Sequence, residues 1–167
     1  LKSTYVKNVV LKKLYNYDYS IDDEILLKLF NEGVDGKEII PFAINNESKC
    51  LIELAKSNDS KIIKKLVLEL KNRFDSIEQS VIQLLKENNC YIVLGRWLQG
   101  RKDCESDKLR WQIIENEEVD EIERSRLLES LLGRTNEKEI RVKAGNLLDS
   151  TNSELLKIIA HNLSTVG

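Results

Sequence analysis

The residue types that most often carry catalysis are scarce in this sequence. His161 is the only histidine, so a Ser-His-Asp triad or a histidine-ligated metal site would have to be built around it alone. Its context, ELLKIIAHNL, instead indicates a histidine at the solvent side or edge of a terminal helix. The glycines at 95, 100 and 133 are isolated, so they predict no phosphate-binding loop. We therefore expect a protein that is not an enzyme and binds no cofactor or metal.

The densest acidic stretch is ENEEVDEIE, residues 115–123. Two of its carboxylates could act as general acid and general base in a hydrolase. A solvated loop followed by a helix start explains the stretch equally directly, because acidic residues at a helix N-terminus interact favourably with the helix dipole. An acidic surface here would also suit a small immunity- or antitoxin-like protein that blocks an enzyme.

Basic and aromatic residues gather in GRWLQGRKDCESDKLRW, residues 95–111. Such groups together can stack on nucleic-acid bases and hold phosphates. The stretch also fits core tryptophans with surface arginines between them, and its own carboxylates cancel much of the charge. The candidate binding residues of this cluster are Arg96, Trp97, Arg101, Arg110 and Trp111.

Three tyrosines alternate with polar residues in YNYDYS, residues 15–20. One interpretation is that the rings cover an open helix end, and the other is a small aromatic contact surface.

The composition predicts helices throughout. Hydrophobic residues make up 41% and charged residues 32%, with one Pro and seven Gly, which favours a folded helical chain. A net charge of -2 predicts no general attraction to nucleic acid or to anionic membranes. The three cysteines are widely spaced without a CxxC motif, which is typical of free thiols in a reducing cytoplasm. No apolar run approaches the roughly 18 residues of a membrane span.

The apolar pattern repeats with a shift of 30 residues. Residues 51–70, LIELAKSNDSKIIKKLVLEL, align with residues 81–100, VIQLLKENNCYIVLGRWLQG, and each segment reads as two amphipathic helices around a polar break. Weaker copies follow at 109–128 and 127–148. Towards the N-terminus we expect Ser3 to cap a helix over 3–15, Ser20 with Asp23 to open the next helix and Gly33 to end it. Pro41 is expected to interrupt a short helix over 37–44, and residues 100–107 to form a loop.

The last copy resembles a HEAT-type repeat. Asn136 lies at its turn, and Ile140, Arg141, Ala144 and Leu148 match the V-R-x-x-A-x-x-x-L form of the second HEAT helix. The resemblance implies a right-handed α-solenoid of stacked antiparallel helical hairpins. We thus expect an all-α, HEAT/ARM-like fold of about ten helices in a single domain, residues 1–167. The chain has no Met, even at position 1, which is compatible with its being part of a longer protein.

In such a stack the second helices line a concave face, which would carry the basic row Lys64, Arg96, Arg141 and Lys143. We expect a cytoplasmic interaction module that binds a protein partner through this face or its loops and does not enter a membrane. The alternative is a nucleic-acid-binding protein, similar in architecture to the alkylpurine DNA glycosylases built on HEAT-like repeats, with Trp97 or Trp111 contacting a base.

Overall fold

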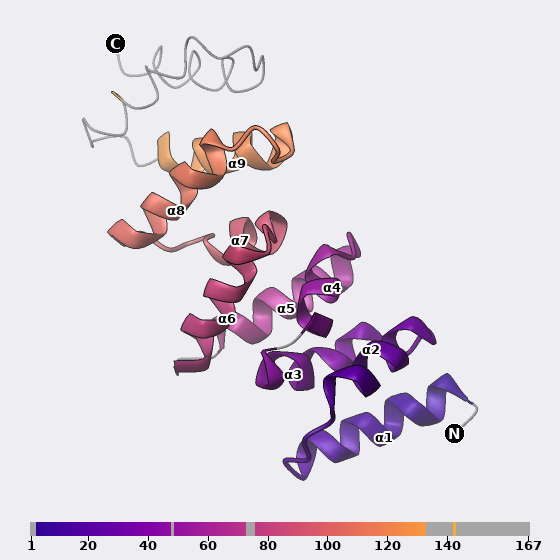
Figure 1. Ribbon diagram of the computed structural model, residues 1–167. Coiled ribbons are helices and arrows are strands. Elements are labelled where there is room, and N and C mark those ends of the chain that lie inside the picture. Colours follow the sequence, from indigo (N-terminus) through magenta and orange to yellow (C-terminus); the bar gives the residue numbers. More distant parts are fainter. Residues whose placement is uncertain (1–2, 48, 73–75, 133–141, 143–167) are drawn as a thin grey trace. The chain divides into compact units, whose positions relative to one another are not determined.

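A computed structural model describes residues 3–47, 49–72 and 76–132, together with residue 142. Within these ranges all regular structure is helical, in nine helices without a strand, which confirms the all-α prediction (Figure 1). None of the helices in this part of the chain has the length and hydrophobicity needed to span a membrane. The chain divides into two compact units, Leu1–Trp97 and Leu98–Gly167. The expectation of one helical-repeat domain stays a prediction.

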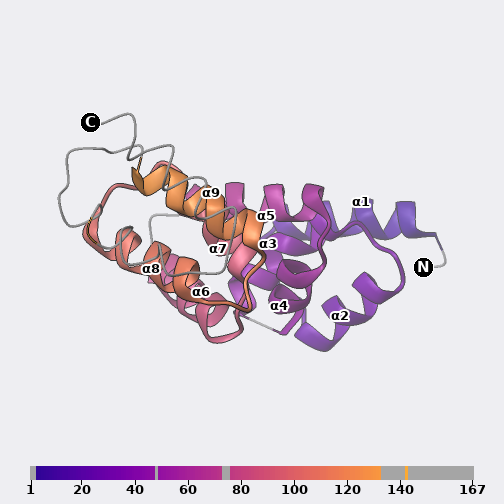
Figure 2. The same cartoon turned by 90° about the horizontal axis from the view of Figure 1, so that it is seen from above.

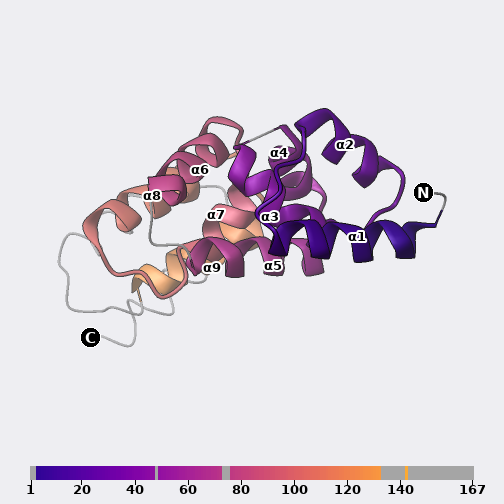
Figure 3. The same cartoon turned by 90° about the horizontal axis from the view of Figure 1, so that it is seen from below.

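The first unit contains seven described helices that alternate between two rows. The odd-numbered helices form one row, in which each helix packs on the next, and α2 packs on α4 in the other row (Figures 2 and 3). The helices are α1 (Thr4–Asn16), α2 (Asp23–Asn31), α3 (Gly36–Asn46), α4 (Lys49–Lys56), α5 (Ser60–Lys71), α6 (Ser76–Glu87) and α7 (Tyr91–Trp97). Sequential pairs such as α4 with α5 and α6 with α7 are in contact, as the hairpin pattern predicts.

The second unit contains two described helices, α8 (Cys104–Glu115) and α9 (Glu121–Leu132), which pack against each other. Asp103 caps α8 by accepting hydrogen bonds from the backbone N–H of Ser106 (2.9 Å) and from its hydroxyl (2.7 Å). The predicted loop over 100–107 is therefore too long, because its last four residues form the first turn of α8. The HEAT-like motif at 140–148 and the predicted helix with His161 lie outside the described residues.

Aspartates are the N-caps of four described helices. Asp22, Asp35 and Asp59 are the N-caps of α2, α3 and α5, and each carboxylate accepts a hydrogen bond from a backbone N–H two residues later. The prediction that Ser20 opens α2 is therefore wrong by two residues, because Asp22 is the capping side chain. Ser3 does precede α1, but its side chain makes no capping hydrogen bond.

Helix α3 lies at the centre of the first unit and runs through Pro41 without ending there. The helix therefore does not start afresh at Pro41, and a kink there stays a prediction. Seven of its eleven residues are buried, since α3 packs on α1, α2, α4 and α5. Its first residue, Gly36, lies so close to neighbouring side chains that a Cβ there would be 2.7 Å from the Cδ1 atom of Ile62. Tertiary packing around α3 thus outweighs the local effect of the proline.

The two hairpins of the repeat correspond at a shift of 31 residues rather than 30. Asn58 and Asn89 both have left-handed backbone geometry, with φ of 55° and 57°, at the turns after α4 and α6. The buried positions agree with this register: Leu51 corresponds to Ile82, and Ile63 to Leu94. A shift of 30 would instead pair Leu68, which is 51% exposed, with the fully buried Leu98. A one-residue error matters because it moves a side chain by about 100° around the helix axis.

Candidate functional site

The basic and aromatic cluster is divided between the two units, and much of it is buried. Trp97 belongs to α7 and is 8% exposed, while its indole N–H donates to a carboxylate oxygen of Glu78 in α6 (3.1 Å). Trp111 belongs to α8 and is 6% exposed. Arg101 is half-buried in the loop before α8. Neither indole ring lies open on a surface, as stacking on a base requires.

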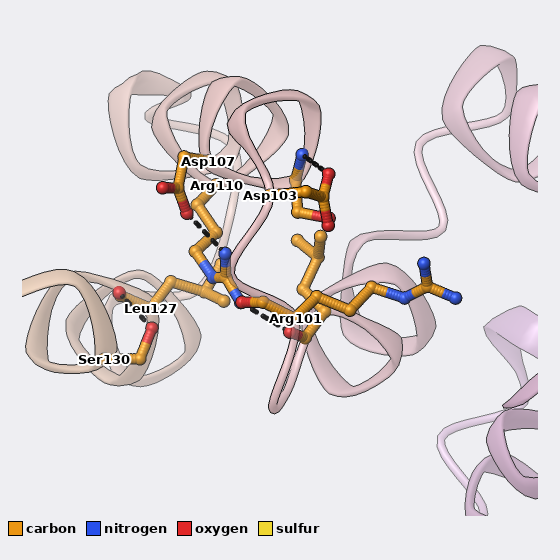
Figure 4. Close-up of polar contacts among 8 residues, drawn as sticks. Arg101, Asp103, Asp107, Arg110, Leu127 and Ser130 are labelled. Atoms are coloured by element: carbon orange, nitrogen blue, oxygen red, sulfur yellow. Dashed lines mark hydrogen bonds and ion pairs between the residues drawn. The ribbon is translucent and has the colours of Figure 1, made fainter. Parts of the chain in front are cut away.

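Arg110 is the most deeply buried charged residue in the described part of the chain, at 2% exposure. Its guanidinium pairs with Asp107 (2.6 Å) and donates to the backbone carbonyls of Leu98 and Arg101 (Figure 4). A planar group with five donors can satisfy a carboxylate and two carbonyls at once. Arg110 therefore holds the loop before α8, and it is not a surface arginine as the sequence suggested.

The predicted basic row is described only in part. Lys64 in α5 is exposed and Arg96 in α7 is half-buried, and these two helices pack on each other. Arg141 and Lys143 lie outside the described residues. A concave row of four cations therefore stays a prediction.

The acidic stretch 115–123 contains the end of α8, the turn at 116–120 and the first three residues of α9, as the interpretation of a loop followed by a helix start predicts. Glu117 and Glu118 are exposed, and Asp120 accepts a hydrogen bond from the backbone N–H of Ile122 (2.9 Å). Among the described residues, no three histidine, cysteine, aspartate or glutamate side chains lie close enough together to hold a metal ion.

The strongest candidate site is a pocket in the first unit that begins at the C-terminal end of α1. The backbone N–H of Asp18 bonds to the carbonyl of Tyr15, and that of Tyr19 bonds to the carbonyl of Leu14 (both 3.1 Å). This is a Schellman ending with Asp18 at the position usually taken by glycine, and Asp18 accordingly has a φ of 53°. The turn places Tyr15, Asp18 and Tyr19 around one opening, where Ser20 also lies.

The other wall of the pocket comes from the end of α3. Phe42 is buried, and its ring meets that of Tyr15 edge to face, with centroids 5.6 Å apart and planes at 75°. The side-chain amide of Asn46 donates to the carbonyl of Ile21 (2.6 Å), which ties the segment after α1 to α3. The pocket has a cavity volume of about 110 Å³. For comparison, a cavity of roughly 150 Å³ can hold benzene, so this pocket has room for the end of one side chain.

Exposed aromatic rings lie at this opening and next to it in the sequence. Of the tyrosines that line the pocket, Tyr19 is 63% exposed and Tyr15 is 38% exposed, while Tyr17, which lies between them in the sequence, is 78% exposed. The tyrosine motif thus includes accessible rings, as the contact-surface interpretation expects, while Tyr15 also packs on Phe42, as the helix-end interpretation expects. We call this pocket, lined by Tyr15, Asp18, Tyr19, Ser20, Phe42, Asn45 and Asn46, the tyrosine pocket.

The sequence pointed to one wall of this pocket and missed the other. The alternation of tyrosines in 15–19 was visible, but Phe42, Asn45 and Asn46 lie more than 20 residues further along the chain. Their only sequence signal was a hydrophobic run ending in two asparagines. Comparison of the chain with protein-family models, with curated proteins and with solved structures found no significant match.

Proposed function

We propose that this protein is a non-catalytic helical-repeat module that binds a protein partner, and that the tyrosine pocket forms part of its binding surface. The observation that carries the proposal is the accessible pocket with exposed tyrosines at its rim. Tyrosine is enriched at protein interfaces because its ring supplies apolar contact while its hydroxyl stays able to hydrogen-bond.

The helix arrangement of the first unit supports the repeat part of the proposal. Its two rows of alternating helices and its 31-residue correspondence are what stacked helical hairpins produce. We propose a HEAT-like, right-handed solenoid as the complete fold and the cytoplasm as its location, in keeping with the free thiols of Cys50, Cys90 and Cys104.

Affinity capture with variant baits tests the proposed role. A bait carrying both Tyr17→Ser and Tyr19→Ser should lose proteins that the unmodified chain recovers, because two exposed aromatic contacts are removed. Tyr5→Ser is the matched control, since Tyr5 is 75% exposed in α1 and does not line the pocket. Recovery of the same proteins by all three baits would contradict a binding role for this surface.

We rank protein binding above nucleic-acid binding because Trp97 and Trp111 are buried. A direct test of the alternative is a fluorescent DNA duplex titrated at low salt. Nucleic-acid binding requires an affinity that falls steeply with added salt, and we expect no such binding.

A further inference from the structure

The lining of the tyrosine pocket is rich in π faces and hydrogen-bond acceptors and contains no cationic residue. Tyr15, Tyr19 and Phe42 supply aromatic rings, and Asp18 supplies a carboxylate beside them. Ser20 and Asn46 add further side-chain oxygens. An aromatic ring attracts a cation to its face, and a neighbouring carboxylate adds to this attraction.

Asp18 occupies its position at a conformational disadvantage. It lies in the left-handed region at the end of α1, where glycine meets no steric penalty. Within the described residues, none of the hydrogen bonds or ion pairs involves the carboxylate of Asp18. The side chain is exposed, so it contributes little to packing. The carboxylate is thus left available at the edge of an aromatic pocket.

We propose that the tyrosine pocket binds a cationic side chain, that of Lys or Arg, presented by a protein partner. The proposal rests on the protein-binding function above and specifies its chemistry. The alkyl stem of such a side chain would lie on Tyr15 and Phe42, and its charged end would meet Asp18 and the face of Tyr19. The pocket volume of about 110 Å³ suits one such group.

An anionic ligand fits this lining poorly. Asp18 would repel it, and no lysine, arginine or histidine lines the pocket to attract it. Acidic residues also follow the pocket in sequence, with Asp22, Asp23 and Glu24 at the start of α2. Asp22 is occupied as the helix cap, and Asp23 accepts a hydrogen bond from the backbone N–H of Cys50 (3.3 Å). Asp18 is therefore the carboxylate placed to meet a cation in the pocket.

The test is an NMR titration of the isotope-labelled full chain, in which the amide chemical shifts report binding. Three probes of similar size are compared: n-butylammonium, n-butylguanidinium and neutral 1-butanol. We expect the two cations to shift the amides of residues 15–20 and 42–46 at concentrations several-fold lower than 1-butanol requires. Equal responses to all three probes, or no response at these residues, would overturn the proposal.

Variants at Asp18 distinguish the effect of its charge on binding from the effect of its backbone conformation on stability. Asp18→Asn keeps a residue that tolerates the left-handed conformation but removes the charge, and we expect roughly two- to fivefold weaker cation binding. Asp18→Gly should weaken binding similarly while raising the melting temperature by roughly 2 to 4 °C, because it relieves the backbone penalty. Glu24→Gln is the matched control, since it removes one exposed negative charge outside the pocket, and it should bind as the unmodified chain does.

A pair of variants at Tyr19 tests the role of the ring. Tyr19→Phe keeps the π face and should retain cation selectivity, whereas Tyr19→Leu keeps apolar bulk and should lose roughly two- to fivefold in affinity. Equal affinities of the two variants would contradict a cation–π contact. Because these probes need no partner protein, a failed titration overturns the cationic chemistry alone, while unchanged capture by the serine variants overturns the proposed function.

Discussion

Buried arginines organise the second unit at the scale of single residues. Arg110 bonds two loop carbonyls and Asp107, and Arg124 in α9 donates from Nε to the carbonyl of Ile114 near the end of α8 (2.7 Å). A buried carbonyl without a donor is unfavourable, so a guanidinium that satisfies several acceptors makes burial of this loop possible. Both arginines have a structural role, although Arg110 was a candidate binding residue in the sequence.

Removing Arg110 should therefore destabilise the second unit strongly. We expect Arg110→Ala to lower the free energy of unfolding by about 3 kcal/mol, because the carbonyls of Leu98 and Arg101 and the partly buried carboxylate of Asp107 each lose a hydrogen bond. Arg126→Ala is the matched control, since Arg126 is 61% exposed in its pair with Glu123 and should change stability by about 0.5 kcal/mol or less. Urea denaturation followed by tryptophan fluorescence measures both, and equal losses would contradict the structural role.

At the scale of elements, local side chains determine where helices begin. The space available between helices determines how closely they pack. Four aspartates cap helices with their carboxylates, whereas Gly36 begins α3 where there is no room for a larger residue. A Cβ at this position would lie 2.7 Å from Cδ1 of Ile62 and 3.1 Å from Cδ2 of Leu54. Both neighbours are buried in the core, which limits how far they can shift.

The close contact at Gly36 predicts the sign of a substitution. Alanine is a better helix former by about 1 kcal/mol, but we expect Gly36→Ala to destabilise the protein by about 1 to 3 kcal/mol because overpacking outweighs propensity. Adding Ile62→Val removes the nearest methyl group and should recover about 1 kcal/mol of that loss in a double-mutant cycle. Additive effects of the two changes, or a stabilising Gly36→Ala, would show that the core accommodates the methyl group.

At the scale of the whole molecule, burial separates the three thiols. Cys104 is exposed, whereas Cys50 and Cys90 are buried. The pKa of Cys50 is raised from 9.0 to about 12, chiefly by burial and also by the nearby carboxylates of Asp23 and Glu53. Burial also raises the pKa of Cys90, although Lys56 opposes this. The folded state thus keeps Cys50 protonated under conditions in which an unfolded chain ionises it.

This difference predicts a loss of stability in alkali. The contribution of the protonated Cys50 is complete below pH 9.0 and is lost as the pH rises towards about 12, because only the unfolded chain releases the proton. Between pH 8 and 10.5 the stability advantage of the unmodified chain over Cys50→Ala should shrink by about 1 to 2 kcal/mol. Circular dichroism in urea measures it. As a control, the difference in stability between the unmodified chain and Cys104→Ala should stay constant over the same pH range. A constant difference for Cys50→Ala as well would contradict the prediction.

The sequence by itself determined the helical class, the hairpin pairing and most turn positions. Those features depend on short-range effects: apolar spacing along a helix, the carboxylates at helix starts, and Asn58, Asn89 or Gly33 in left-handed geometry at helix ends. The predicted repeat period was wrong by one residue. Leu54 aligns with Leu84 at a shift of 30 and with Leu85 at a shift of 31, and the two leucines are equally hydrophobic. Only burial separates them, with Leu85 in the core and Leu84 partly exposed.

Only the tertiary structure decided which charged and aromatic residues remain accessible. The sequence left open whether Trp97 and Trp111 lie in the core or on a binding surface, and the structure buries both. Arg110 was expected at the surface under either interpretation, but it is buried because backbone carbonyls converge on its guanidinium. Phe42 and Asn46 joined the tyrosines because α3 packs on α1. Such contacts join residues distant in sequence, so no local pattern encodes them, whereas the helices follow from interactions within a few residues.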